Sequence, residues 1–263
     1  MVIEADSDGV RTLTLNRPDK LNALSAELVE SLSQGLRRAS ADEDVRVVIL
    51  AGAGRSFCSG YDLDETGPSD EAGVREGLAH LLDRLLEVFD HPKPVIAQVQ
   101  GHCLAGGCDL MMMCDLVVAS EDAVFGQPEI RFGSAIVAHV LPWLIGARRA
   151  KELVLTGFDR LEAHRALEMG LVNKVVEPDR LETETIALAR QLAVVDPEVM
   201  SLTKRAMNAA WEEAGFKSAL HRGLELGGDI ETLRSPERLE FDRIVAERGL
   251  KEAVKWRDQR FSD

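Results

Sequence analysis

Short apolar runs alternate with longer segments of helical periodicity over most of the chain. The runs at 45–51 and 94–99 are almost entirely apolar, which is typical of strands that are covered on both faces. Apolar residues recur at helical spacing between about 70 and 89, and Ser25 can cap a helix that continues to about Ser40. This alternation predicts an α/β fold in which crossover helices join parallel strands.

Several shorter elements complete this pattern. The runs at 2–5 and 10–16 flank a turn that contains glycine, and together they predict a β-hairpin. A helix should begin near Gly106, and further strands are expected at 116–119 and 172–176. The first two thirds of the chain therefore read as a mixed α/β unit.

Only helical patterns follow Pro197. The pair Ser235-Pro236 is a strong start signal, because it places a capping side chain before a proline at the first helical position. We therefore expect two regions, an α/β core over 1–196 and a helical region over 197–263. Helices are expected at about 198–213, 216–231, 236–248 and 249–257.

The composition excludes several classes of protein. Of 263 residues, 45% are apolar and 29% are charged, and 31 Lys and Arg against 45 Asp and Glu give a net charge of −14. Nucleic acids and anionic membranes are bound by basic surfaces, so we expect neither as a partner. The sequence shows no signal peptide and no apolar run of about 18 residues, which predicts a cytoplasmic protein. Cys58, Cys103, Cys108 and Cys114 form no CxxC pair, so we expect buried thiols and no metal site.

Two loops that contain glycine each follow a predicted strand, at 55–64 and 101–110. Neither loop matches the fingerprints for dinucleotides or nucleoside triphosphates. Glycine allows sharp turns that leave backbone N–H groups unpaired, and two such loops can direct two N–H groups at one oxygen atom. From the residues alone, two tight turns without chemical function remain the simpler interpretation.

Two carboxylates accompany the second loop. Asp109 falls in the first turn of the helix expected near Gly106, and Glu129 lies in the turn-like sequence FGQPEI. Two acids on neighbouring segments can act as a general acid and a general base. Asp109 can also serve only to complement the helix dipole, and spacing alone does not decide between these roles.

Six segments resemble the enoyl-CoA hydratase/isomerase (crotonase) superfamily and follow the order found there. The resemblance implies a crotonase-like spiral of ββα units with a C-terminal helical oligomerisation region, assembled as a homotrimer or a dimer of trimers. It implies an acyl-CoA thioester as substrate, with coenzyme A as part of that substrate and no metal or other cofactor. The segments are LNRPDKLNAL (15–24), FCSGYDL (57–63), PVIAQVQGHCLAGGCDLMMMCDLVVAS (94–120), FGQPEI (125–130), LTG (155–157) and MGLVNKVV (169–176).

The resemblance also implies a set of site residues. The backbone N–H groups of Tyr61 and Gly106 would form an oxyanion hole for the thioester oxygen. Asp109 and Glu129 match the catalytic carboxylates of the family, where the first holds water and the second protonates the α carbon. The implied substrate-binding residues are Lys20, Leu21, Ala23, Tyr61, Asp62, Leu63, Asp64, Gly106 and Gly107.

The activity that we expect is hydration of the 2,3 double bond of a 2-enoyl-CoA, as in fatty acid metabolism. A double-bond isomerase, a CoA-thioester hydrolase or lyase, and a catalytically weak acyl-CoA-binding paralogue are the alternatives. Three departures from the family pattern keep them open. Asp stands at position 109 where a hydratase usually has Glu, Tyr61 replaces a small residue, and the segment 131–146 is shorter and bulkier.

Four further side chains are candidates for roles at this site. His139, in the altered segment, is either an additional base or a structural histidine. Coenzyme A is anionic and the chain is acidic, so Lys20, Arg55 and Arg257 are candidates for offsetting its charge.

Overall fold

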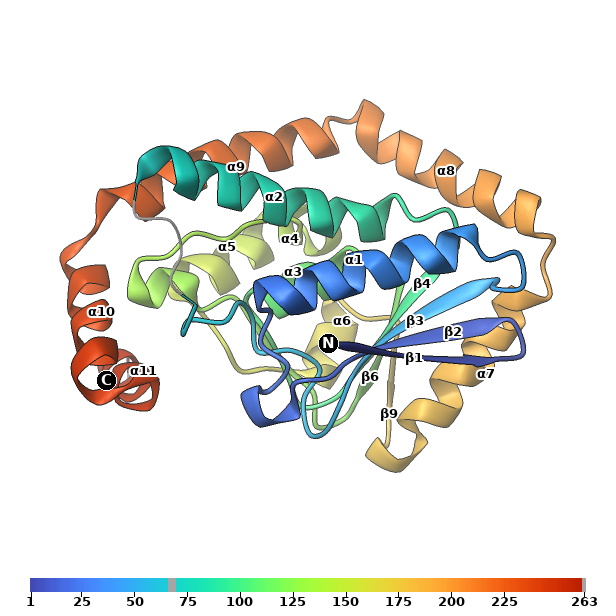
Figure 1. Ribbon diagram of the computed structural model, residues 1–263, viewed down its shortest axis with the longest axis horizontal. Coiled ribbons are helices and arrows are strands. Elements are labelled where there is room, and N and C mark those ends of the chain that lie inside the picture. Colours follow the sequence, from blue (N-terminus) through green and yellow to red (C-terminus); the bar gives the residue numbers. More distant parts are fainter. Residues whose placement is uncertain (66–69, 262–263) are drawn as a thin grey trace.

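The structure is a computed structural model that describes residues 1–65 and 70–261, and its main sheet has six strands (Figure 1). They are β1 (Val2–Ser7), β2 (Val10–Leu15), β3 (Val47–Gly52), β4 (Val95–Val99), β6 (Leu116–Ser120) and β9 (Lys174–Val176). Their order across the sheet is β1-β2-β3-β4-β6-β9. β1 and β2 form an antiparallel hairpin, and all other neighbours are parallel. The predicted hairpin and parallel strands are confirmed.

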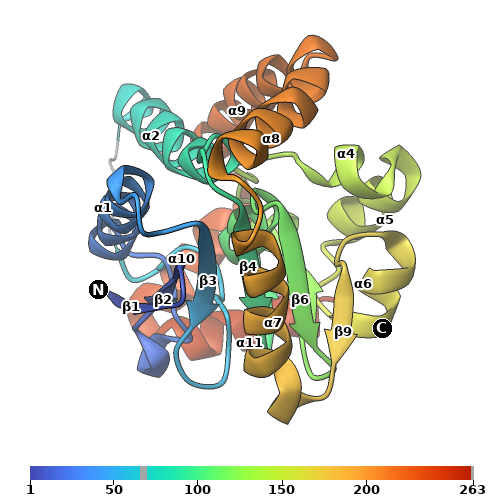
Figure 2. The same ribbon diagram turned by 90° about the vertical axis from the view of Figure 1, so that its right-hand side faces the viewer.

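Helices cover both faces of this sheet. α7 (Leu181–Ala193) lies across one face, and α1 (Ala26–Ala41) lies on the other side (Figure 2). Side chains of successive strand residues point to opposite faces. Accordingly, Val47 belongs to the cluster that α7 covers, whereas Val48 belongs to the main core together with Leu28 of α1. Burial on both sides explains why the strand sequences are almost entirely apolar.

The capping residues fix where the first two long helices begin. The Ser25 side chain accepts a hydrogen bond from the N–H of Leu28 at the start of α1. The Asp70 side chain accepts one from the N–H of Gly73 at the start of α2 (Glu71–Phe89). Each bond satisfies an N–H group that the helix itself leaves unpaired. Both helices begin within one residue of the positions expected from the sequence.

A second, three-stranded sheet was not predicted. It consists of β5 (His102–Leu104), β7 (Val124–Gly126) and β8 (Leu161–Glu162), in that order. β5 leads into α3 (Gly106–Met112), and β7 leads into the short helix η2 (Glu129–Phe132). Because β5 and β7 are parallel neighbours, the segments that leave them emerge at the same edge. This small sheet therefore brings the two predicted acids together.

The remaining helices surround these sheets. α8 and α9 extend along one side of the molecule next to α2, and α10 and α11 lie at one end (Figure 1). None of the described helices is long and apolar enough to cross a membrane. The bounds are η1 (Pro18–Lys20), α4 (Leu141–Ile145), α5 (Ala147–Thr156), α6 (Ala163–Met169), η3 (Pro178–Arg180), α8 (Pro197–Glu213), α9 (Phe216–Leu233), α10 (Pro236–Arg248) and α11 (Leu250–Gln259).

The last two helices pack against η2 of the same chain. Phe132 in η2 and Phe241 in α10 stack with their ring centroids 5.1 Å apart. The Asp159 carboxylate lies between two guanidinium groups, 3.4 Å from Nη1 of Arg131 and 3.6 Å from Nη2 of Arg257. The position of η2 therefore depends on α10 and α11.

Candidate active site

Two unpaired backbone N–H groups lie where the two glycine loops meet. Within residues 1–65 and 70–261, neither the N–H of Tyr61 nor that of Gly106 donates a hydrogen bond. Gly106 is the first residue of α3, so its N–H has no partner inside the helix. The loops are in close contact, because a Cβ atom on Gly60 would lie only 3.5 Å from the Gly106 nitrogen. Two donors near one point can hold a developing oxyanion.

The backbone around these donors is tightly constrained. Ala105 adopts φ 51° and ψ −128°, a backbone conformation that residues other than glycine rarely adopt. The N–H of Ala105 is bonded to the carbonyl of Gly126 at 2.8 Å, which holds the loop in this shape. A Cβ atom on Gly107 would lie 2.5 Å from the Cys58 carbonyl oxygen, so the second loop requires glycine there. The strain at Ala105 directs the Gly106 N–H away from the protein's own acceptors.

Asp109 is fully buried in the first turn of α3. Its Oδ1 accepts a hydrogen bond of 2.9 Å from Nε2 of Gln127, and its Oδ2 accepts one of 3.3 Å from the N–H of Ala138. These bonds fix the carboxylate from two sides. Burial nevertheless raises the pKa of Asp109 to about 7, because the bonds only partly offset the loss of water around the charge.

Glu129 is also buried, and its Oε2 has no hydrogen-bond partner among the described residues. Burial, and after it the nearby charge of Asp109, raise the pKa of Glu129 well above its usual value. Burial of this kind favours the protonated form of a carboxyl group. Burial therefore raises the pKa of both acids, which favours groups that can give or take a proton near neutral pH.

The Tyr61 side chain lies inside the site. A Cβ atom on Gly106 would come within 2.5 Å of Cε2 of the Tyr61 ring, so the ring rests directly on the start of α3. The ring also lines a cavity of about 20 Å³ together with Leu24, Leu85 and Leu110. Burial raises the pKa of the Tyr61 phenol well above its usual value, so the group stays neutral. The ring that replaces the small residue usual in the family therefore narrows the pocket.

The residues predicted to contact coenzyme A lie together at the edge of the site. Lys20 pairs with Asp64 at 2.5 Å, and Arg17 pairs with Asp62 at 2.7 Å. These pairs join the loop after β2 to the segment after Tyr61. The remaining predicted residues of these two segments are Leu21, Ala23 and Leu63.

Arg257 is not free to offset the charge of a ligand. Its side chain is only 11% exposed and pairs with Asp159 and Asp258. Arg55 is exposed, as expected for a residue that contacts solvent or a ligand. His139 is half-buried, and a Cβ atom on Gly223 of α9 would lie 2.7 Å from its Cδ2. His139 therefore packs against α9 and lines the same cavity as Gln127.

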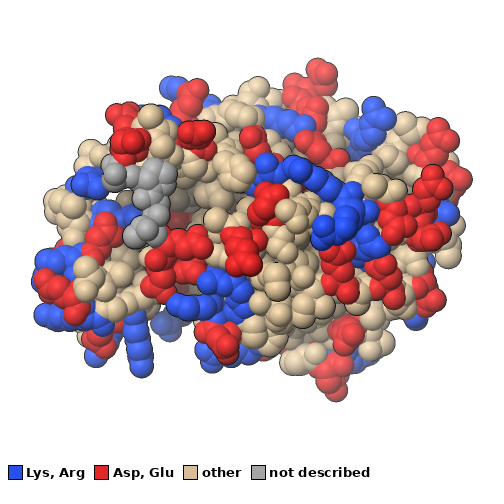
Figure 3. All heavy atoms as spheres, viewed as in Figure 1, with Lys and Arg blue, Asp and Glu red and all other residues tan. Residues whose placement is uncertain are grey.

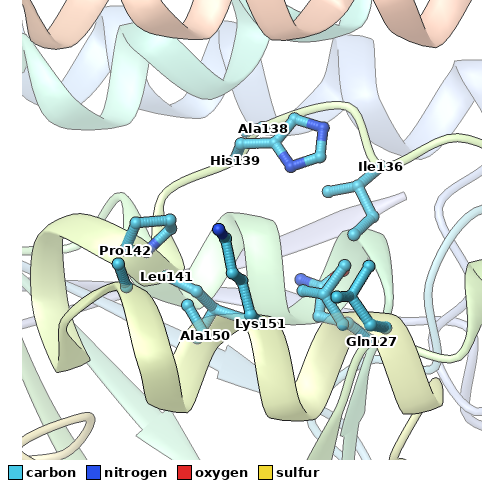
Figure 4. Close-up of a pocket in the computed structure, with 11 residues that line it drawn as sticks. Gln127, Ile136, Ala138, His139, Leu141, Pro142, Ala150 and Lys151 are labelled. Atoms are coloured by element: carbon cyan, nitrogen blue, oxygen red, sulfur yellow. The ribbon is translucent and has the colours of Figure 1, made fainter.

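Sequence reasoning missed Gln127 and the backbone of Ala138 as partners of Asp109. Gln127 lies in the FGQPEI motif, and its position two residues before Glu129 was the available signal. Both residues line a cavity of about 320 Å³ between α5 and the loop that contains His139 (Figure 4). Among the described residues, no three His, Cys, Asp or Glu side chains gather so that they could hold a metal ion.

The raised pKa of Asp109 predicts how stability depends on pH. In the unfolded chain this carboxyl ionises near pH ~4, whereas in the folded protein its pKa is about 7. Between these values the unfolded state has lost a proton that the folded state retains, so this group lowers stability as pH rises. We expect Asp109→Asn to remove this decrease in stability with rising pH.

The free energy of unfolding in urea, measured for both proteins at about pH 5 and about pH 8, checks this expectation. The free energy of unfolding of the variant, relative to that of wild type, should be higher at about pH 8 than at about pH 5. A difference that stays constant with pH would show that Asp109 titrates normally.

The chain is similar to proteins of known family over most of its length. The model of the enoyl-CoA hydratase/isomerase family matches residues 5–226. A putative enoyl-CoA hydratase of Thermus thermophilus is 37% identical over 226 residues, covering 83% of this chain and 89% of the relative. A short-chain-enoyl-CoA hydratase of Clostridium acetobutylicum is 38% identical over 254 residues, covering 93% of this chain and 89% of the relative.

Solved structures match the whole fold. The crystal structure of an enoyl-CoA hydratase/isomerase from Xanthobacter autotrophicus Py2 superposes with a TM-score of 0.97 at 41% identity. It covers 100% of this chain and 98% of the other. An enoyl-CoA hydratase structure from Mycobacterium smegmatis has a TM-score of 0.91 at 28% identity, covering 100% of this chain and 94% of the other. The crotonase-like fold and its C-terminal helices, expected from the sequence, are confirmed.

Proposed function

The chain belongs to the enoyl-CoA hydratase/isomerase family, and we propose that it adds water across the double bond of a 2-enoyl-CoA thioester. One observation carries this proposal. Two unpaired N–H groups, of Tyr61 and Gly106, lie in the loops that carry or adjoin two buried acids whose pKa values burial raises. The curated relatives named above support a thioester of coenzyme A as the substrate.

The oxyanion hole performs the first part of the reaction. The thioester carbonyl oxygen accepts hydrogen bonds from the N–H groups of Tyr61 and Gly106. Attack at the β carbon moves negative charge onto this oxygen, and fixed donors in a site shielded from water stabilise that charge. The removal of one such donor in a hydrolase costs about 2.7–4 kcal/mol of transition-state stabilisation, which indicates the scale.

The acids move the protons. A water molecule forms a bond to the β carbon and gives a proton to Asp109. The electron pair of the double bond shifts to the α carbon and the thioester carbonyl, and the α carbon takes the proton of Glu129. The product is a 3-hydroxyacyl-CoA, and one proton has passed from Glu129 to the product while another has reached Asp109. Proton exchange between the two acids then restores the starting state.

Double-bond isomerisation is the second candidate, and one observation favours it. Both oxygens of Asp109 are engaged by Gln127 and Ala138, which limits their use on a water molecule. An isomerase needs only one acid to move a proton between two carbons, and Glu129 has an unengaged oxygen for this. Thioester hydrolysis, carbon–carbon cleavage and simple acyl-CoA binding stay as alternatives that the same assays detect.

Asp109→Asn separates the two candidates. We expect wild type to consume crotonyl-CoA, followed by loss of the conjugated thioester absorbance, and the variant to be slower by about 100-fold, because the water loses its base. With a 3-enoyl-CoA, an isomerase would keep most of its rate in the variant. If wild type binds acyl-CoA but converts neither substrate, the hydratase proposal is wrong.

The outer parts of the site support binding of coenzyme A. Lys20 and Arg17 provide positive charge where the two loops meet, although each already pairs with an aspartate. Acidic and basic side chains are interspersed over the face shown in Figure 3, so any attraction for the ligand's phosphates has to be local. Assembly into a trimer is part of this proposal, and the exposed apolar residues on α8 and α9 fit it. They include Val199, Leu202, Met207, Leu226 and Ile230.

A further inference from the structure

The cavity of about 320 Å³ borders the residues that hold Asp109 in place. Gln127 and Ala138, which hold the two oxygens of Asp109, also form part of the cavity wall. Its volume is at the low end of the range of about 300–1,000 Å³ for ligand pockets. The cavity therefore has room for part of a ligand whose reacting carbons lie at Asp109.

The opposite side of the site is closed. There the Tyr61 ring fills the space between Gly106 and the side chains of α1 and α2, leaving about 20 Å³. This space has room for about one water molecule, so an acyl chain attached to the reacting carbons does not fit into it. The cavity lined by Gln127 and Ala138, of about 320 Å³, is therefore the larger of the two spaces.

The far wall of the cavity has an unusual composition. Apolar side chains from α5 and from the loop before α4 make up most of it, including Ile136, Leu141 and Val154. Lys151 of α5 is exposed at the rim of the cavity and is the one cationic residue among the described lining residues; within residues 1–65 and 70–261 no acidic side chain pairs with it. In Figure 4 its side chain extends from α5 toward the loop that carries His139. Burial lowers the pKa of His139, so the imidazole adds no charge at neutral pH.

We propose that this cavity receives the acyl chain of the substrate and that Lys151 pairs with a carboxylate at the far end of that chain. The inference rests on the proposed function and specifies its substrate class, a CoA thioester of an α,ω-dicarboxylic acid. The apolar walls remove the methylene groups of the chain from water. A carboxylate at the end of the chain would meet the ammonium group of Lys151, which is exposed and has no acidic partner among the described residues.

Binding of unreactive substrate analogues tests this without any turnover. The probes are succinyl-, glutaryl- and adipyl-CoA, each compared by calorimetry with its ω-amide, which has the same shape but no charge. We expect wild type to bind at least one acid about tenfold more tightly than its amide, the low end of what a hydrogen bond between charged groups contributes. This preference should decrease as the salt concentration rises.

Three variants locate the preference. Lys151→Met should abolish it, and Lys151→Arg should retain it. Arg148→Met is the matched control, because Arg148 is exposed on the same helix but does not line the cavity, and the preference should survive there. Val154→Phe should weaken binding of the longest probe first, since a larger side chain shortens the cavity.

Two results would overturn the inference: equal binding of acid and amide at every chain length, or an undiminished preference in Lys151→Met. Hydration of crotonyl-CoA, which carries no terminal carboxylate, tests the proposed function separately. Activity with crotonyl-CoA but no preference for acids would contradict the inference alone.

Discussion

Replacing Glu129 by Gln should lower the rate of hydration by about 10²–10⁴-fold, because the α carbon then has no proton donor. Gln has nearly the shape of Glu but carries no transferable proton. The Oε2 atom has no hydrogen-bond partner among the described residues, so the exchange breaks no hydrogen bond at that atom. The rate is measured as loss of the conjugated absorbance of crotonyl-CoA, at saturating substrate.

The fold should tolerate this change. Burial raises the pKa of Glu129, which means that its ionised form destabilises the folded state, so Gln should leave thermal stability unchanged or slightly higher. Glu162→Gln is the matched control, since Glu162 is exposed in β8 and should keep full activity. A Glu129→Gln variant that retains most of the wild-type rate would remove Glu129 from the mechanism.

Gly106→Ala should reduce the rate by about 10²–10³-fold, the cost of disturbing an oxyanion-hole donor. The new Cβ atom would lie 2.5 Å from Cε2 and 2.7 Å from Cδ2 of Tyr61, closer than real contacts allow. The ring packs against the main core, which includes Leu85 and Leu110, so relief requires a shift of the ring or of the backbone. Both N–H donors belong to the two residues that clash. Steady-state kinetics with crotonyl-CoA measures the loss.

A double variant tests whether the clash is the cause. Tyr61→Ala removes the ring but keeps the N–H group, so combining it with Gly106→Ala should restore part of the rate. Gly77→Ala is the control for glycine replacement, because no atom lies within 4 Å of its added Cβ, and it should be active and slightly more stable. If the double variant is as slow as Gly106→Ala alone, steric contact with Tyr61 is not the cause.

The sequence predicted most of the long elements because their signals are local. The apolar run that contains Val48 is buried on both faces, and Ser25 and Asp70 cap the helices that follow them. The helical tail was predicted for the same reason, since Pro236 follows a capping serine. The strands of the second sheet were missed because each has only two or three residues, too few to show a period.

The arrangement of the site depended on contacts between distant segments. The resemblance to the family indicated Asp109 and Glu129, but their positions relative to each other come from the pairing of β5 with β7. No local pattern indicates that Gln127 holds Asp109 or that Tyr61 rests on Gly106. The suggested role of Arg257 failed for a similar reason, because a charged residue near the end of the chain looks solvent-exposed until its partners are known.

The support of η2 by α10 and α11 sets an order of assembly during synthesis. The loops that carry the N–H groups of Tyr61 and Gly106 are built from segments before β8. The acid on η2 has to wait until the stacking partner of Phe132, in the last part of the chain, has been made. A chain clipped before α10 should therefore lose the packing that holds Glu129 in place while it keeps both glycine loops.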